Sequence, residues 1–249
     1  MELLPQTVWV IGFVFARIGA LMMLAPGIGD SFVPGRVRLM VSLFLAILIA
    51  PIVSAAIPAL PAQAADMAFM LVKEIVIGLS LGLGTRILFS ALATAGAIAG
   101  MQTGLAMATA FDPSQNSQGA VFGTLLALLG TALIFQTDTH HWFLTGAANS
   151  YNNFIPGAPL PLGDIAQFTL KAFSQAFSLA IQITAPLLIF GIVMNIALGI
   201  VNRIAPAIQV FFIGQPIQIL LGIMLFSVTA GAGMLVWLDA IAAAGKSLN

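Results

Sequence analysis

The chain has 249 residues, of which 60% are hydrophobic and 6% are charged. A soluble domain carries about 25% charged residues because its surface faces water, so this composition excludes a soluble globular protein and predicts an integral membrane protein. The net charge of zero gives no indication of a nucleic-acid partner, and a chain without cysteine can form neither a disulfide nor a thiolate metal site.

Six long apolar stretches, separated by proline-rich or polar segments, follow one another along the chain. They are residues 8–24, 39–57, 75–110, 120–135, 166–201 and 207–244. No alternation of β-branched residues is long enough for the strands of a barrel. The sequence therefore predicts an all-α integral membrane protein with about six long, kinked helical segments arranged as hairpins.

The stretches at 75–110, 166–201 and 207–244 are longer than one membrane crossing requires. At a rise of 1.5 Å per residue each extends about 50 Å, against a hydrocarbon core of about 30 Å. We expect each to tilt, break or extend beyond the bilayer, as suits a protein packed chiefly against other protein. The expected break points contain glycine or proline, and they are Gly82 to Gly84, Pro186, Gly214 to Pro216, Gly231 and Gly233.

Small residues four positions apart mark two predicted helix-packing faces. Residues at this spacing lie on one side of a helix and let a second helix approach closely in lipid. Asn195 is polar, and we expect it to hydrogen-bond to another helix instead of facing hydrocarbon. The first face consists of Gly78, Gly82, Gly96, Gly100 and Gly104, and the second of Gly191, Asn195 and Gly199.

A polar, helix-breaking loop follows the first of these faces and interrupts the apolar chain. Asp112 and Pro113 stop a helix, and polar side chains cannot lie in hydrocarbon unless protein or water surrounds them. A closely packed helix that leads into such a loop predicts a constriction in a membrane assembly. Met101, Met107 and Phe111 flank the loop at helical spacing. Their flexible or apolar side chains would either seal a pore around varied contents or serve as ordinary helix packing. The loop continues as Ser114, Gln115 and Asn116.

Four ionisable residues, Arg17, Lys73, Glu74 and Arg86, lie within or at the edge of apolar segments. Such residues are costly in a membrane, at about 2.5–3.5 kcal/mol on insertion scales, and therefore raise the possibility of an ion or proton path. The other interpretation is interhelical pairing, or side chains that reach the membrane surface near a helix end. The structural interpretation is favoured because no second carboxylate continues a relay.

The sequence offers no catalytic set. His140 and His141 beside Asp138 resemble a metal site, but adjacent histidines point in different directions and no further His or Cys completes it. With Trp142 following, an interfacial aromatic turn is the favoured interpretation. No Ser-His-Asp arrangement, phosphate loop or pair of carboxylates can be assembled. We therefore expect neither an enzyme nor a bound cofactor.

Five motifs in a fixed order carry a resemblance to a known family. They are Ala25-Pro26 with Pro34-Gly35-Arg36-Val37-Arg38; Lys73 to Gly82; Ala95-Gly96 to Ala106; Phe111-Asp112-Pro113; and Asn195 to Pro206 with Phe212 to Pro216. Over nearly its whole length the chain resembles the FliR family, the R subunit of the flagellar type III protein export gate, with counterparts in injectisomes. It departs at Ala97, where family members often carry an acidic residue, and at Gln215, where the family has an apolar residue.

The resemblance implies a non-enzymatic core subunit of the export gate in the bacterial inner (cell) membrane, at the flagellar basal body. One copy would join P, Q and B subunits in a helical assembly and help to form the channel for unfolded flagellar proteins. Within a single domain, residues 1–150 would be the P-like part and residues 166–249 the Q-like helical hairpin. The family's pore-plugging loop carries over to residues 107–119.

A small-molecule secondary transporter is the alternative from another class. Such transporters usually contain repeats with broken helices at matching positions of the two halves. The break at Asp112 has no counterpart in the second half, which disfavours this alternative. The motifs leave open whether the machine is a flagellum or an injectisome.

Overall fold

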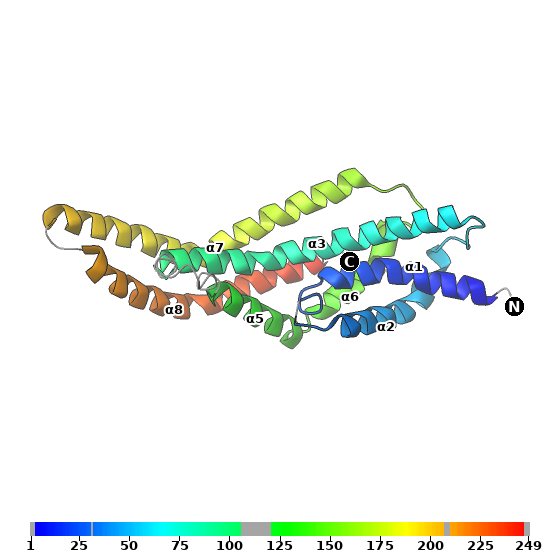
Figure 1. The fold of residues 1–249 in the computed structure, drawn as a ribbon, viewed down its shortest axis with the longest axis horizontal. Helices are drawn as coiled ribbons and strands as arrows, with labels where there is room; N and C mark the ends of the chain where they lie inside the picture. Colours follow the sequence, from blue (N-terminus) through cyan, green and yellow to red (C-terminus); the bar gives the residue numbers. More distant parts are fainter. Residues whose placement is uncertain (1–2, 31, 106–120, 207–209, 247–249) are drawn as a thin grey trace. The chain divides into compact units, whose positions relative to one another are not determined.

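The computed structural model describes residues 3–30, 32–105, 121–206 and 210–246, and the regular elements in these ranges are all helical (Figure 1). The all-α prediction is confirmed. The elements are α1 (Leu3–Leu24), α2 (Gly35–Val53), the short 3₁₀ helix η1 (Ser54–Ala56), α3 (Ala64–Gln102), α5 (Val121–Gln136), α6 (His140–Asn153), α7 (Leu162–Ile204) and α8 (Val210–Lys246).

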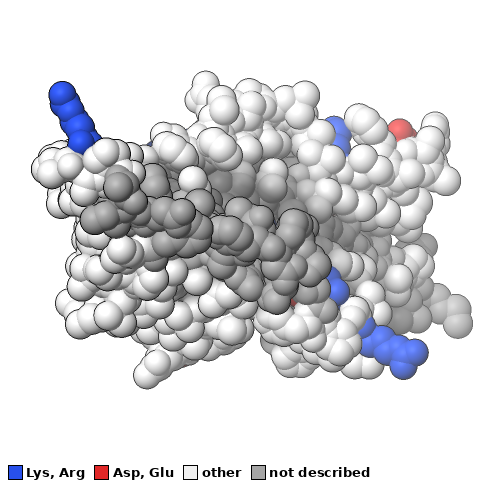
Figure 2. Space-filling model, turned by 60° about the vertical axis from the view of Figure 1, so that its left-hand side comes forward, with Lys and Arg blue, Asp and Glu red and all other residues white. Residues whose placement is uncertain are grey.

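The described helices have the length and composition of membrane spans. Five of them qualify on both counts: α1, α2 with η1, α3, α7 and α8, and a sixth is added if α5 and α6 are counted as one broken span. Figure 2 shows a face on which charged side chains are sparse, as expected for a surface that meets lipid or other apolar protein. The prediction of an integral membrane protein holds.

The largest departures from the predicted stretches are at α3 and α6. Helix α3 begins at Ala64 instead of residue 75, and Asp66 in its first turn favours a helix N-terminus. It also ends at Gln102 instead of continuing to residue 110, because the chain turns at Gly104, whose φ of 77° suits glycine at a helix end. Helix α6 was not predicted at all.

The helices continue through every expected break point. Interior prolines stand at Pro51 in α2, Pro186 in α7 and Pro216 in α8, and none of them divides its helix. A proline removes one backbone hydrogen bond and bends a helix without ending it when the turns on either side remain bonded. Figure 1 accordingly draws α8 as a curved, continuous helix.

By their internal contacts the residues form two compact units. The first comprises residues 1–88, 137–174 and 242–249, and the second comprises residues 89–136 and 175–241. Helices α3, α7 and α8 contribute residues to both units. This division does not test the P-like and Q-like parts, which stay a prediction.

The first unit has a core built on α1. Phe13, Val14 and Ile18 of α1 are fully buried, and they belong to a cluster that includes Ile49 of α2 and Ile77 of α3. Helix α6 adds Ala147 and Tyr151 to the same cluster. The core therefore joins helices from distant parts of the sequence.

The second unit is held by aromatic contacts and by a helical hairpin. The ring of Phe89 lies 5.5 Å from that of Trp237, and the ring of Phe122 lies 4.5 Å from that of Phe226. A Cβ at Gly214 of α8 would meet Leu198 of α7, and a Cβ at Gly233 would lie 2.9 Å from Ile183. Since the later residue of α8 meets the earlier residue of α7, the two helices are antiparallel in this unit.

Candidate functional site

The first pair of predicted packing glycines brings α3 against α1. A Cβ at Gly78 would meet the carbonyl oxygen of Arg17 and would lie 2.9 Å from Ala20 Cβ. One turn later, a Cβ at Gly82 would lie 2.8 Å from the Leu21 oxygen. Because real Cβ atoms do not approach backbone this closely, only glycine permits the two helices to pack as they do.

A second close approach joins α3 to α5. A Cβ at Gly96 would meet the backbone nitrogen and Cα of Gly123, so two glycines face each other across the helix pair. Gly123 in turn lies against Ala93, with its Cβ position 3.3 Å from the Ala93 oxygen. Gly100 is buried one turn beyond Gly96. Small residues thus bring these two backbones close to each other.

Gly104 belongs to the end of α3 and not to its packing face. Its amide donates to the Met101 oxygen at 3.2 Å, and its own oxygen accepts a hydrogen bond from Gln215 Nε2 of α8 at 2.9 Å. A second glutamine of α8, Gln218, donates through Nε2 to the Gln102 oxygen at 3.0 Å. Side-chain amides of α8 therefore bond the carbonyl of the last residue of α3 and a carbonyl of the turn that follows it, which the sequence analysis did not anticipate.

The second predicted packing face, on α7, is only partly occupied by this chain. A Cβ at Gly191 would meet the side chain of Gln102, so this position packs against α3. Asn195 and Gly199 are exposed, and a Cβ at Gly199 would have no atom within 4 Å. The C-terminal part of this face, at Asn195 and Gly199, is therefore not covered by other residues of the chain.

A buried ion pair joins α1 and α3. Arg17 and Glu74 have relative exposures of 0% and 1%, and the guanidinium contacts the carboxylate twice, at 2.5 Å through Nε and at 3.1 Å through a terminal nitrogen. The interhelical pairing predicted as the structural interpretation is confirmed for these two residues. A bidentate contact of this kind fixes orientation as well as charge.

Helix α6 completes the surroundings of Arg17. The guanidinium also donates to Ser150 Oγ at 3.2 Å and to the Phe154 oxygen at 2.9 Å, and it lies 3.9 Å from the centre of the Tyr151 ring. Arg17 thus joins α1, α3 and α6. Among the described residues, its ion-pair and hydrogen-bond partners include no second carboxylate that would extend a proton path.

The other two ionisable residues lie in less buried surroundings. Lys73 Nζ donates to the Ala158 oxygen at 3.3 Å and lies 4.5 Å from the centre of the Phe69 ring. Arg86 pairs with Asp30 at 2.7 Å, with 45% of its side chain exposed. Lys73 thus contacts a backbone oxygen and an aromatic ring, and Arg86 forms a partly exposed ion pair.

Asp138 lies in the turn that precedes α6, and His140 and His141 are the first two residues of this helix. One potential ligand atom from each side chain lies within 4.8 Å of the others, so these groups converge more than adjacent histidines were expected to. His141 Nδ1 lies 3.2 Å from the Asp138 oxygen and 3.8 Å from its carboxylate. The local turn accounts for this convergence.

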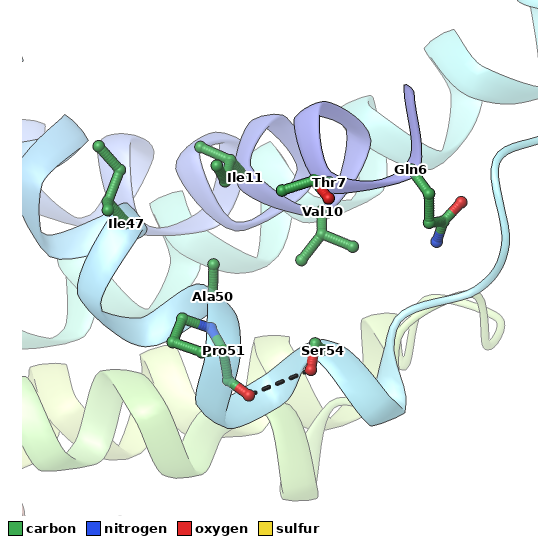
Figure 3. A pocket seen from close by; sticks show the side chains of 8 residues that line it. All are labelled: Gln6, Thr7, Val10, Ile11, Ile47, Ala50, Pro51 and Ser54. Atoms are coloured by element: carbon green, nitrogen blue, oxygen red, sulfur yellow. Dashed lines mark hydrogen bonds between the residues drawn. The ribbon is translucent and has the colours of Figure 1, made fainter. Parts of the chain in front are cut away.

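A groove of about 420 Å³ lies between α1 and α2 (Figure 3). Its wall is mostly apolar, and the hydroxyl of Ser54 donates to the Pro51 oxygen at 3.1 Å. None of its lining residues is acidic, basic or histidine. They are Gln6, Thr7, Val10, Ile11, Ile47, Ala50, Pro51 and Ser54.

The predicted plug residues Met107, Phe111, Asp112, Pro113, Ser114, Gln115 and Asn116 lie outside the described residues. The structure describes the chain up to Leu105 and again from Val121, where α5 begins. Met101, which was expected to flank the plug, is exposed on α3. The end of α3 is therefore the described point from which the loop departs.

Membrane-length helices packed closely through glycines, with a buried ion pair between two of them, define an integral membrane protein. The chain belongs to the bacterial export proteins, family 1, whose sequence model matches residues 8–244. It is 37% identical over 232 residues to the flagellar biosynthetic protein FliR of Caulobacter vibrioides, covering 93% of this chain and 92% of the relative.

Two further relatives come from different machines. FliR of Escherichia coli is 31% identical over 214 residues, covering 85% of this chain and 80% of the relative. The Yop proteins translocation protein T of Yersinia pestis is 31% identical over 163 residues, covering 65% of this chain and 62% of the relative. The family is thus one of export proteins, and none of these relatives supports a small-molecule transporter.

Proposed function

We propose that this chain is the R-type core subunit of a type III protein export gate in the bacterial inner membrane, at the flagellar basal body. The observation that carries the proposal is the family match over residues 8–244 of a chain whose helices have membrane length. The subunit assembles with P-, Q- and B-like subunits and forms part of the channel for unfolded exported proteins. It performs no catalysis itself.

The exposed apolar surface of α7 and α8 supports a hetero-oligomer. Only 22% of the most apolar part of each helix is buried within the chain, against 56% for α3. Ile196 and Ile200 are exposed close to the open Gly199 position in α7, and Leu220 is exposed on α8. Lipid can cover large apolar side chains, but a small-residue face beside them favours close contact with another helix.

Expression of the full chain with and without P- and Q-like subunits tests this assembly. We expect a defined complex in mild detergent when the partners are present, and aggregation or degradation when they are absent. A stable, monodisperse monomer that moves a small solute into vesicles would contradict the proposal and would favour the transporter.

The proposed role of residues 107–119 is to plug the closed channel. The support is the polar, helix-breaking sequence between two apolar helices, together with the family resemblance. Deletion of residues 112–116 should leave the complex assembled but should let small ions leak through it. The measurement is the conductance of the purified gate in a planar bilayer, and an unchanged conductance in an assembled gate would rule out the plug.

A further inference from the structure

Polar side chains follow one side of the first half of α7. At 3.6 residues per turn their spacing places them within about 100° of the helix circumference, and the stretch from the first to the last extends about 27 Å. All of them are exposed, and α7 is one continuous helix over these residues. We call this set the polar stripe, and it consists of Asp164, Gln167, Lys171, Ser174, Gln175, Ser178 and Gln182.

The same turns of α7 carry two other faces. Ala176 and Leu179 are buried within the chain. On the remaining face the large side chains of Leu170, Phe173 and Phe177 are 70%, 65% and 56% exposed. The polar stripe therefore lies between a face that is packed within the chain and a face that requires lipid or apolar protein.

Hydrocarbon cannot cover the polar stripe. Charged and amide side chains are costly in lipid, and in membrane proteins they face a water-filled cavity or other polar groups. Among the described residues, Asp164 and Lys171 have no ion-pair partner. The Gln182 amide donates to Ser178 Oγ of its own helix at 3.1 Å, and both side chains are exposed. The stripe therefore requires water or a polar partner.

The composition of the polar stripe favours an enclosed water path over the membrane surface. Helices that lie on a membrane surface are rich in Lys and Arg on their polar face, whereas the stripe has one Lys, one Asp and otherwise only Ser and Gln. Serine hydroxyls and glutamine amides both donate and accept hydrogen bonds, so they suit the backbone of an unfolded polypeptide of any sequence. Beyond Pro186, α7 instead exposes Ile192, Val193 and Ile196.

We propose that the polar stripe of α7 lines the water-filled path of the gate and contacts the backbone of unfolded exported polypeptide there. The inference rests on the proposed function, in which the chain forms part of an export channel, and it names the residues of this chain that meet the cargo. The neighbouring face with Phe173 and Phe177 then lies away from the water, against lipid or an apolar helix.

Cysteine labelling tests this inference, because the chain has no cysteine of its own and a label on it reports the introduced residue alone. Ser174→Cys and Ser178→Cys place a thiol on the stripe with little change in size. Phe173→Cys and Phe177→Cys are the matched controls, since each is adjacent in sequence and exposed in the chain but lies on the apolar face.

Each variant is purified with P- and Q-like subunits and treated with a small, charged thiol reagent. The labelling rate is measured in the empty complex and in one that holds a cysteine-free cargo, arrested because it is fused to a stably folded domain. We expect the stripe cysteines to react about tenfold faster than the controls, since only the thiolate reacts and it forms more readily in water than in apolar surroundings. Arrested cargo should slow the labelling of the stripe and leave the controls unchanged.

Three results would overturn the inference. Stripe cysteines that react only after the complex is denatured would place a partner subunit over the stripe, and labelling that arrested cargo does not slow would place it in water outside the path. Equal rates for stripe and control cysteines would remove the distinction between the two faces. Should Ser178→Cys not assemble, Ser174→Cys carries the same outcomes. Failure of the proposed function differs, because the unsubstituted chain would then not co-purify with P- and Q-like subunits.

Discussion

The helices around Arg17 find most of their packing and hydrogen-bond partners within the chain, whereas the hairpin of α7 and α8 does not. Around Arg17, the glycines of α3 touch the backbone of α1, and the guanidinium has partners from three helices. On the hairpin, Asn195 and Gly199 are exposed, and most of the apolar surface has no cover within the chain. The comparison is between a self-sufficient core and a surface that the chain itself leaves uncovered.

This difference separates residues that hold the chain together from residues that the proposed assembly would cover. A bidentate ion pair enclosed by protein specifies which helices meet, because any other arrangement would leave a charge unpaired in an apolar environment. The hairpin carries no such pair among its described residues, and its small and apolar residues are general contact surfaces. We therefore expect changes near Arg17 to affect the chain itself, and changes on the hairpin to affect assembly.

The largest expected effect is that of Glu74→Gln. The substitution leaves Arg17 charged and buried without its carboxylate, and removing one partner of a buried pair costs about 3–5 kcal/mol. We expect low recovery of the chain and a marked fall in the thermal midpoint of the complex in detergent. A midpoint close to that of the wild type would show that the self-sufficient core does not depend on the pair.

Gly78→Ala should have the next largest effect. The added methyl group would meet the Arg17 oxygen, and overpacking of this kind costs about 1–3 kcal/mol. Gly12→Ala in α1 is the matched control, because a Cβ there has no atom within 4 Å, and alanine favours a helix by up to about 1 kcal/mol. Thermal scanning of both variants gives the comparison, and equal midpoints would contradict the close approach of α1 and α3.

Gly199→Leu should act on assembly alone. Within the chain the position is open, so we expect wild-type amounts of the chain in the membrane but loss of most of its co-purification with P- and Q-like subunits. Gly199→Ala should reduce co-purification less, because it adds a single methyl group. Unchanged recovery of the complex with leucine would place this part of α7 against lipid.

The smallest expected effect is that of Asp30→Asn. It removes the charge opposite Arg86, but this pair is partly exposed, and such pairs contribute about 0–1 kcal/mol. Asparagine also keeps an oxygen for the Gly27 amide, which donates to Asp30 at 3.0 Å. The shift in thermal midpoint should be far smaller than that of Glu74→Gln, and a comparable shift would remove the distinction between the enclosed and the exposed ion pair.

The sequence by itself determined the class of the protein and most of its helices. Transfer of apolar side chains into lipid is roughly additive along the chain, so long apolar stretches identify membrane helices without any knowledge of their neighbours. The same locality explains why Gly78, Gly82 and Gly96 could be identified as contact positions, since their spacing repeats with the helical turn. The identity of the contacted helices did not follow from this spacing.

Only the tertiary structure decided which helices and side chains pair with one another. Helix α6 lies in a polar, aromatic segment. Arg17, more than a hundred positions earlier in the chain, contacts Ser150, Tyr151 and the Phe154 oxygen at its end. Likewise, the carbonyl oxygens of Gln102 and Gly104 accept hydrogen bonds from Gln218 and Gln215 of a distant helix. Hydrogen bonds and ion pairs between remote residues form only when folding brings them together, so no local pattern contains them.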